Sequence, residues 1–238
     1  MVNLTTPSGQ ATYTTTQLVV GSHNVNVTYG NTLPFGASAS GTLVQAVMTY
    51  TSSVSLSISA NPSVFGQSVT YMATMNSAAA TGTVTFTIDG ARTFAVNVDI
   101  NGDARLVFGS LPVGAHSVVA RYNGSVLYDP STSATLTHTV AKANTNIVLR
   151  TSANPARAGT YVTFMATITA AGPGVGVPTG YVRFTIDGRI YNVLLAQGGI
   201  ARYSTRLLAR GNHTVTATYL GSTNFNPSRR LSFTQRIQ

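Results

Sequence analysis

One pattern returns three times along the chain and constrains its fold more than any other feature. The pattern is Leu-x-x-Gly-x-His-x-Val-x-Val/Ala-x-Tyr, and it spans residues 18–29, 111–122 and 208–219. Its three histidines are 93 and 97 residues apart. This spacing is the length of one small all-β domain, so the sequence predicts an array of similar modules rather than one large fold.

Alignment of the repeats divides the chain into two complete modules and one half. Residues 51–142 (the second module) and 143–238 (the third module) align almost throughout, and the third adds only a Gly- and Pro-rich insertion at 171–178. Residues 1–50 (the half-module) match only the second half of the repeat. We therefore predict that its first three strands are missing. Its apolar face and strand edges would then be open, which favours a homo-oligomer formed through residues 1–50.

The segments between these landmarks alternate between apolar and polar residues, which predicts half-buried strands. Val69, Tyr71 and Ala73 share one side of such a segment, and residues 162–168 repeat the alternation. Asp-Gly pairs at 89–90 and 187–188 separate alternating runs, which predicts tight hairpins. About seven strands per module, regular turn signals and no helical period are typical of an immunoglobulin-like sandwich. The expected fold is all-β, with two complete sandwiches and one N-terminal half.

Composition excludes several kinds of chemistry and places the charge unevenly. The chain has no cysteine, so disulfides and thiolate metal sites are excluded. Charged residues make up only 8% of it, against about 25% in an average domain. The net charge is +9, and the third module carries all of this excess, with ten arginines against one aspartate. No apolar run is long enough to span a membrane, and the first residues do not resemble a signal peptide.

Three phrases of the sequence resemble the repeats of bacterial immunoglobulin-like domains. They are the stretch 59–70 (SANPSVFGQSVT), the stretch 178–188 (PTGYVRFTIDG) and the histidine-tyrosine pattern itself. The resemblance implies sandwiches strung in tandem within large exported surface proteins, where they act as stalks or adhesive arms. Family members usually carry an acidic residue shortly after the tyrosine, where this chain has Ser125 and Ser222. That departure puts an ionic role of the position in doubt here.

The recurring histidines and tyrosines are interpreted as structural. Single histidines about 93 residues apart lie in different modules and cannot share a metal ion, so each is expected to cap the end of its sandwich by bonding to loop backbone. The tyrosines resemble the tyrosine corner of such sandwiches, in which the hydroxyl fixes a loop. The residues in question are His23, His116, His213, Tyr29, Tyr122 and Tyr219.

Two further positions have the residue types of functional sites. Asp99 and Asp103 have the carboxylate density of a calcium loop but lack a downstream bidentate acid, which favours a hairpin turn over a metal site. His138 aligns with Gln45 and Gln235, which favours a hydrogen-bonding position over a catalytic one. We expect no catalytic site and no cofactor, because no nucleophile elbow, carboxylate pair, zinc spacing or phosphate loop occurs. The sole lysine, Lys142, lies at a linker, which argues against internal isopeptide crosslinks.

Arginines on the outward phase of third-module strands are the unusual electrostatic feature. Arg150, Arg183, Arg202 and Arg206 are candidates for a basic face that binds an acidic polysaccharide or another polyanion, with a merely solvated face as the alternative.

Three functions stay open at this stage. The first is a non-enzymatic spacer in an exported or cell-surface bacterial protein, with neighbouring immunoglobulin-like modules as its partners. The second is a polyanion-binding module, and the third is a self-assembling subunit whose half-module is completed by a neighbouring chain.

Overall fold

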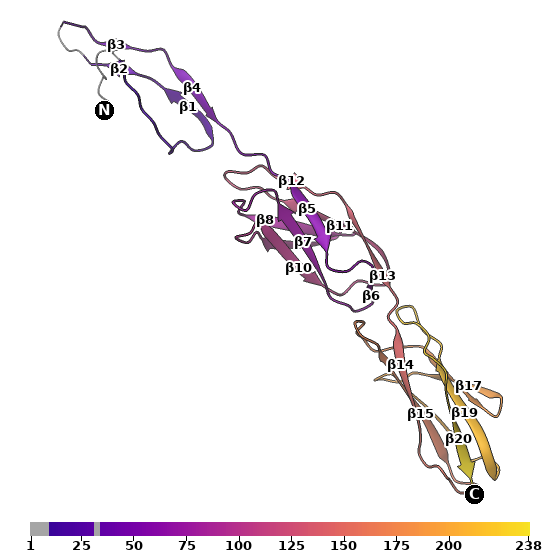
Figure 1. The fold of residues 1–238 in the computed structure, drawn as a ribbon. Helices are drawn as coiled ribbons and strands as arrows, with labels where there is room; N and C mark the ends of the chain where they lie inside the picture. Colours follow the sequence, from indigo (N-terminus) through magenta and orange to yellow (C-terminus); the bar gives the residue numbers. More distant parts are fainter. Residues whose placement is uncertain (1–9, 31–33) are drawn as a thin grey trace.

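The computed structural model describes residues 10–30 and 34–238 and shows the half-module and the two complete modules following one another end to end (Figure 1). All regular elements within this described part are β-strands, which confirms the all-β prediction. No helix in it has the length and apolar character needed to cross a membrane.

The strands follow the repeats. The half-module contains β1 (Gly21–Val25), β2 (Thr28–Tyr29), β3 (Ser38–Ala39) and β4 (Leu43–Val47). The second module contains β5 (Val54–Ile58), β6 (Ser63–Val64), β7 (Val69–Met75), β8 (Thr83–Ile88), β9 (Arg92–Asn97), β10 (Asp103–Phe108), β11 (Gly114–Tyr122), β12 (Ser131–Thr132) and β13 (Leu136–Ala141). The third module contains β14 (Thr145–Thr151), β15 (Val162–Ala170), β16 (Tyr181–Ile186), β17 (Arg189–Leu194), β18 (Ile200–Thr205), β19 (Gly211–Tyr219) and β20 (Leu231–Ile237).

Each complete module is a sandwich of two antiparallel sheets with the same strand order. In the second module, β10, β7 and β5 form one sheet, and β13, β11, β8 and β9 form the other, which β6 extends by parallel pairing with β13. In the third module, the corresponding sheets are β14-β15-β18 and β17-β16-β19-β20. Strands that are distant in sequence are therefore neighbours in each sheet, as in a Greek-key sandwich.

Alternation along the strands places the core between the two sheets. In β7, Val69, Tyr71 and Ala73 are buried and their neighbours are less so, and β15 repeats the pattern. The inward side chains of the facing sheet meet them to form one apolar cluster per module. Since the chain has no cysteine, apolar packing and hydrogen bonds hold each sandwich together without a disulfide.

The two predicted Asp-Gly hairpins are confirmed. Asp89 and Asp187 have φ angles of 51° and 47°, and Gly90 and Gly188 follow with φ of 68° and 83°. Aspartate and glycine are among the residues that best tolerate this left-handed region, which twists the turn to match the strands on either side of it.

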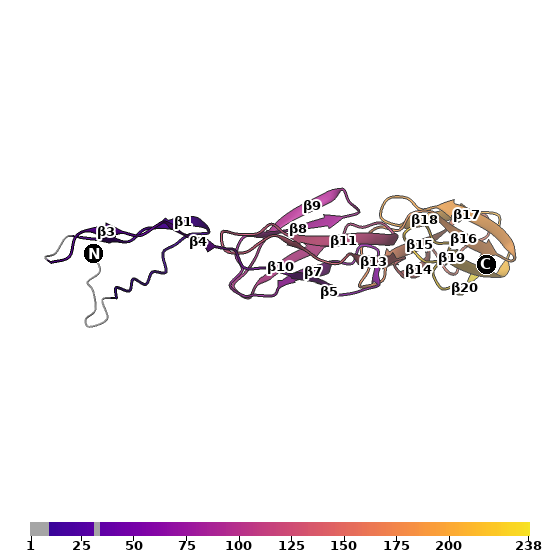
Figure 2. The same ribbon diagram turned by 90° about the horizontal axis from the view of Figure 1, so that it is seen from above.

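The half-module is a single layer where the complete modules have two (Figure 2). β1 pairs with β4, and β2 pairs with β3. Residues 11–13, which align with part of β10, form no strand here. The physical reason is that β10 pairs with β7, and the described half-module has no counterpart of β7.

Candidate functional site

The recurring histidine of each complete module bridges a loop and the Asp-Gly hairpin. His116 Nε2 donates to the carbonyl of Pro112 at 3.0 Å, and its Nδ1 lies 2.8 Å from Asp89 Oδ2. The second oxygen of Asp89 accepts the backbone N–H of Ser117 at 3.0 Å. This carboxylate therefore joins the hairpin to the strand beside it.

The third module repeats the arrangement. His213 Nδ1 lies 2.6 Å from Asp187 Oδ2, and its Nε2 donates to the carbonyl of Ala209 at 2.7 Å. Because both neighbours of the ring are acceptors, the hydrogen bond with Asp187 raises the pKa of His213, and it lowers the pKa of Asp187. The histidines stand out in the sequence pattern, whereas the aspartates were predicted only as turn residues. Their similar spacing of 27 and 26 residues before the histidine is the signal that could have indicated the pairing.

The half-module has one of the two histidine contacts of this arrangement, the bond to the loop carbonyl. His23 Nε2 donates to the carbonyl of Val19 at 2.6 Å, four residues earlier, as in the other two modules. Residues 1–50 contain no aspartate or glutamate, so the carboxylate is not supplied from within the half-module.

The recurring tyrosines hold loops at the opposite end of the strand. Tyr122 and Tyr219 are fully buried, and their hydroxyls donate at 2.6 Å to the carbonyls of Thr81 and Thr179. Burial raises the pKa of Tyr219, which keeps that hydroxyl protonated as a donor. Tyr29 of the half-module is only partly buried.

His138 lies in the core of the second module. Its Nδ1 is 2.6 Å from the hydroxyl of Tyr71, and its Nε2 is 2.8 Å from Ser63 Oγ. Burial lowers the pKa of His138 and raises that of Tyr71 to about 12, so both groups are neutral at pH 7. A neutral imidazole has one donor and one acceptor, which two hydroxyls can satisfy together.

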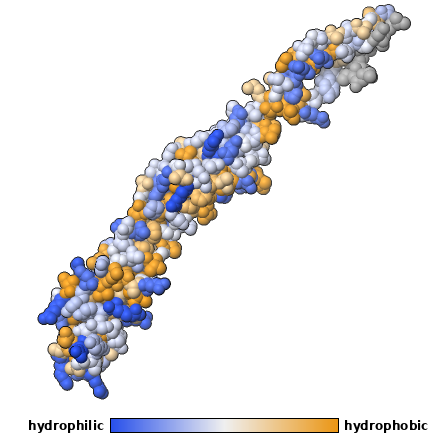
Figure 3. Space-filling view, turned by 180° about the vertical axis from the view of Figure 1, so that it is seen from behind, coloured by the Kyte–Doolittle hydropathy of each residue, from blue (hydrophilic) through white to orange (hydrophobic). Residues whose placement is uncertain are grey.

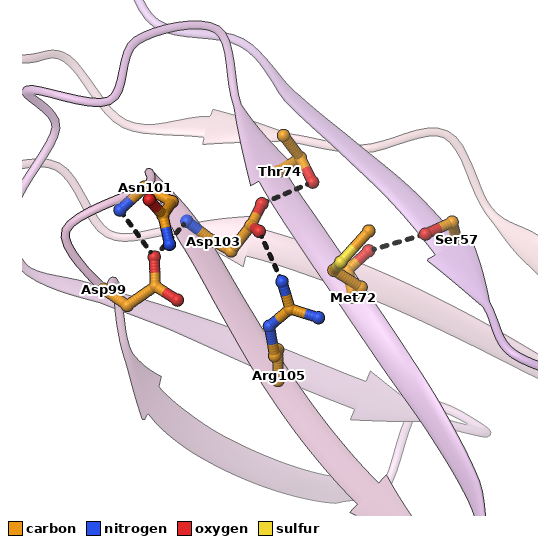
Figure 4. Close-up of polar contacts among 7 residues, drawn as sticks. All are labelled: Ser57, Met72, Thr74, Asp99, Asn101, Asp103 and Arg105. Atoms are coloured by element: carbon orange, nitrogen blue, oxygen red, sulfur yellow. Dashed lines mark hydrogen bonds and ion pairs between the residues drawn. The ribbon is translucent and has the colours of Figure 1, made fainter.

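The loop at Asp99 and Asp103 uses its carboxylates within the protein (Figure 4). Asp99 Oδ1 accepts the N–H groups of Asn101 and Asp103, and these hydrogen bonds lower the pKa of Asp99. Asp103 pairs with Arg105 at 2.7 Å and accepts the hydroxyl of Thr74. In the described ranges no three acidic or histidine side chains converge in a way that holds a metal ion.

The four candidate arginines do not form one face. Arg150 in β14 and Arg202 in β18 lie on either side of Met165 in one sheet row. Arg206 follows β18, with its guanidinium 5.7 Å from the ring centre of Tyr161. Arg183 lies in β16 of the other sheet, so the prediction of a single four-arginine face is wrong. Outward side chains of the two sheets point in opposite directions, and sequence phase alone does not say which sheet a strand joins.

The second and third modules contact each other through specific interactions, here called the joint, that the sequence did not predict. The ring of Phe65 meets the ring of Phe225 edge to face, with centroids 5.4 Å apart and an interplanar angle of 78°. The insertion at 171–178 reaches across, and the N–H of Val175 donates to the carbonyl of Phe65 at 3.3 Å. At the linker, Lys142 Nζ donates to the carbonyl of Ser222 at 2.7 Å. The insertion was visible in the alignment, but nothing in its sequence indicated that it contacts another module.

Comparison with known protein families identifies the family to which the chain belongs. The model of the bacterial Ig-like domain (group 3) matches residues 56–141 and 149–238. The chain belongs to this family, as its sequence motifs indicated.

Solved structures with similar folds come from several kinds of protein. The two-domain fibronectin type III segment of chicken tenascin is 11% identical, with a TM-score of 0.41 over 76% of this chain and 97% of that one. The fibronectin(III)-like modules of Clostridium thermocellum CbhA are 17% identical, with a TM-score of 0.33 over 78% and 94%. A Ca2+-stabilised adhesin with which an Antarctic bacterium binds ice is 18% identical, with a TM-score of 0.35. The match covers 91% of this chain but only 57% of that adhesin. No curated protein matches the chain.

Proposed function

We propose that this chain is a stiff, non-enzymatic spacer in the stalk or adhesive arm of an exported or cell-surface bacterial protein. Its place in the bacterial Ig-like family supports this function. The observation that carries it is the joint between the second and third modules, because a spacer transmits reach only if its modules do not pivot.

The joint combines contacts of three kinds. Just after the boundary at residue 142, parallel backbone bonds anchor the linker to the third module: the N–H of Ala143 donates to Asn224 at 3.0 Å, and the N–H of Asn226 donates to Ala143 at 2.9 Å. The aromatic contact of Phe65 adds apolar packing, and Phe225 is only 2% exposed. The insertion adds a backbone bond to Phe65 beside this aromatic pair. Together, the anchored linker, the aromatic contact and the insertion restrict bending at the joint.

Two equivalent glycines offer a matched test of this stiffness. Gly66 has φ of +80°, and a Cβ there would collide with the backbone of Val175 in the next module. Gly159 holds the same place in the third module with φ of +77°, but a Cβ there meets nothing within 4 Å. Both alanine variants carry similar backbone strain of about 1 kcal/mol, and only Gly66→Ala displaces the insertion from the joint.

The measurement is the relative orientation of the two modules from NMR residual dipolar couplings. We expect one alignment tensor for both modules in the unmodified chain and in Gly159→Ala, and two different tensors in Gly66→Ala. Separate tensors in the unmodified chain would show freely pivoting modules and would rule the stiff spacer out.

We infer a second, weaker function from the row formed by Arg150 and Arg202, with Arg206 nearby: contact with a polyanion such as an acidic polysaccharide. The third module holds ten of the chain's fourteen basic residues, which supports such contact. On a heparin column, Arg150→Ala with Arg202→Ala should elute at lower salt than Arg183→Ala with Arg189→Ala, which removes two arginines from the opposite sheet. Equal elution of the two variants would show that net charge alone retains the chain.

A further inference from the structure

Two tyrosine rings stack on each other between the two sheets of the third module. The rings of Tyr191 in β17 and Tyr203 in β18 have centroids 4.2 Å apart and an interplanar angle of 28°. β17 belongs to the sheet β17-β16-β19-β20, and β18 belongs to the sheet β14-β15-β18. Backbone hydrogen bonds join strands only within each sheet, so this stack is a side-chain contact that links the two layers of the sandwich.

Further contacts hold the two rings in place. Tyr203 also stacks on Phe184, with centroids 6.4 Å apart and an interplanar angle of 30°. Burial and a hydrogen bond with Tyr191 raise the pKa of Tyr203 to about 12, which keeps this phenol protonated at neutral pH. Because the hydroxyls are bonded while the rings stack, the Cε carbons that flank each hydroxyl carbon lie beside one another. Both side chains are only partly buried, so a small solute can approach them.

The second module packs the same place without a phenol. Phe94 lies opposite Phe86 in β8, as Tyr191 lies opposite Phe184 in β16. Leu106 of β10 holds the place that Tyr203 holds in β18. Apolar side chains therefore suffice for the packing of this edge, and packing alone does not account for the two hydroxyls of the third module.

We propose that Tyr191 and Tyr203 form an oxidative modification site, at which a peroxidase with hydrogen peroxide joins the two rings by a carbon–carbon bond, a dityrosine crosslink. The oxidant removes one electron and the phenolic proton from each ring. The two radicals couple between one Cε carbon of each ring, and the hydrogen on each of these carbons returns to the phenolic oxygen as a proton. The chain loses two hydrogen atoms, and one hydrogen peroxide is reduced to two waters.

The structure favours coupling within one chain over coupling between chains. The stack already holds the two rings together, which removes the entropic cost of an encounter. Two copies would have to approach each other through third modules that each carry ten arginines against one aspartate, and such surfaces repel. Figure 3 shows strongly hydrophilic side chains on the surface of that module. The expected product is therefore a crosslinked monomer.

The crosslink would join the two sheets covalently in a chain that has no cysteine. Exported domains commonly use disulfides for this purpose, because they fold where oxidants are present. The extracellular setting rests on the proposed function, whereas the reaction of the two rings does not. A failure of the crosslink leaves the spacer function untouched, since that function depends on the joint.

The test treats the dilute full chain with a haem peroxidase and hydrogen peroxide, followed by tryptic digestion and mass spectrometry. Trypsin cuts after arginine, and Arg202 separates the two tyrosines. We expect peptides 190–202 and 203–206 to appear as a linked pair whose combined mass is lower by two hydrogen atoms. Where the crosslink hinders the cut at Arg202, the single peptide 190–206 shows the same loss.

Two controls show whether the fold brings the rings together. Tyr203→Phe keeps a ring in the stack but removes the phenol, and it should abolish the linked pair. Tyr181→Phe, the matched change at an exposed tyrosine of the same module, should leave the yield unchanged. Synthetic peptides 190–202 and 203–206, mixed at the concentration of the chain, should give at least about tenfold less product, because no fold holds them together.

The proposal is overturned if the linked pair does not form in the full chain. This holds whether oxidation leaves the tyrosines unlinked, links separate chains, or links only Tyr50 to Tyr128, whose rings lie 5.6 Å apart at 37°. It is also overturned if the separate peptides couple as efficiently as the chain, because the stack would then contribute nothing to the reaction.

Discussion

The second and third modules place different polar groups at the same buried position. His138 and Gln235 occupy equivalent places in the strand that pairs with the recurring histidine, and both are buried. His138 is satisfied by Tyr71 and Ser63. Gln235 Oε1 instead accepts the hydroxyl of Thr151 at 2.8 Å, and its Nε2 donates to a backbone carbonyl.

The residues around this position also differ between the two modules, and each set matches the polar side chain that it surrounds. The third module has Phe164 and Ala156 where the second has Tyr71 and Ser63, and the second has Ile58 where the third has Thr151. The scaffold thus requires a satisfied polar group at this place, and it accepts either network as long as the partners match. The unit that can be exchanged between modules is the network rather than the single residue.

Removal of the buried polar side chain should produce the largest difference in stability between the two modules. His138→Ala leaves the buried hydroxyls of Tyr71 and Ser63 without a partner and opens a cavity, so we expect a loss of about 3 kcal/mol in the unfolding free energy of the second module. Gln235→Ala should cost the third module less, about 2 kcal/mol, because Thr151 is only partly buried and can reach water. Urea unfolding followed by NMR signals of each module measures both. A larger loss for Gln235→Ala would contradict this account of the two networks.

Exchange of the two hydrogen-bond networks should have an intermediate effect on the stability of the second module, and this effect should depend on the surrounding residues. His138→Gln alone should cost the second module about 2 kcal/mol, since the amide replaces a ring that joins two hydroxyls. Addition of Tyr71→Phe, Ser63→Ala and Ile58→Thr transplants the third-module network and should recover at least half of that loss. The same unfolding experiment gives the coupling between the changes. Strictly additive effects would show that the residues do not act as a unit.

The tyrosine corners should respond equally, which makes them a control for the comparison. Tyr122→Phe and Tyr219→Phe each remove a 2.6 Å hydrogen bond to a threonine carbonyl and leave the packing unchanged. Each module should lose about 1 kcal/mol. A difference above about 0.5 kcal/mol would mean that the two loops do not depend on their tyrosines in the same way.

The smallest expected effect is a pH dependence. A fall in pH should change the contributions of His138 and His213 to the unfolding free energy in opposite directions. The pKa of His138 is lowered in the folded state, so its contribution is present above the ordinary value of 6.5 and is lost as the pH falls. The pKa of His213 is raised, so its contribution is present below 6.5 and is lost as the pH rises through the folded value. The change that His213 contributes should be about 1 kcal/mol or less, because its partner Asp187 is nearly half exposed.

Urea unfolding at pH 5 and pH 8 with module-specific NMR signals tests this difference. Asp187→Asn should flatten the dependence of the third module, and His138→Gln should do the same for the second. The lowered pKa of Asp187 sets the acid limit: its own contribution is present above 3.8 and is lost only at lower pH. An unchanged pH dependence of either module in its variant would contradict the sign assigned to that histidine.

Much of the fold could be read from the sequence because it is encoded locally. The alternation in β7 and β15 and the Asp-Gly turns at 89 and 187 depend on residues close together in the chain. The roles of the site residues depended on distant partners. Asp89 meets its histidine 27 residues away, and Arg183 departs from the other three arginines because its strand joins the opposite sheet.

By itself, the sequence determined the repeat, the strand periodicity and the match of residues 1–50 to only half of the repeat, since each is a pattern along one dimension. Only the tertiary structure decided that the 171–178 insertion reaches Phe65 and that the candidate arginines divide between two sheets. It also decided that His116 and His213 each contact an aspartate side chain. The reason is physical: period-two patterning specifies which side of a strand is buried, whereas the neighbour across a sheet or a joint is selected by packing over the whole module.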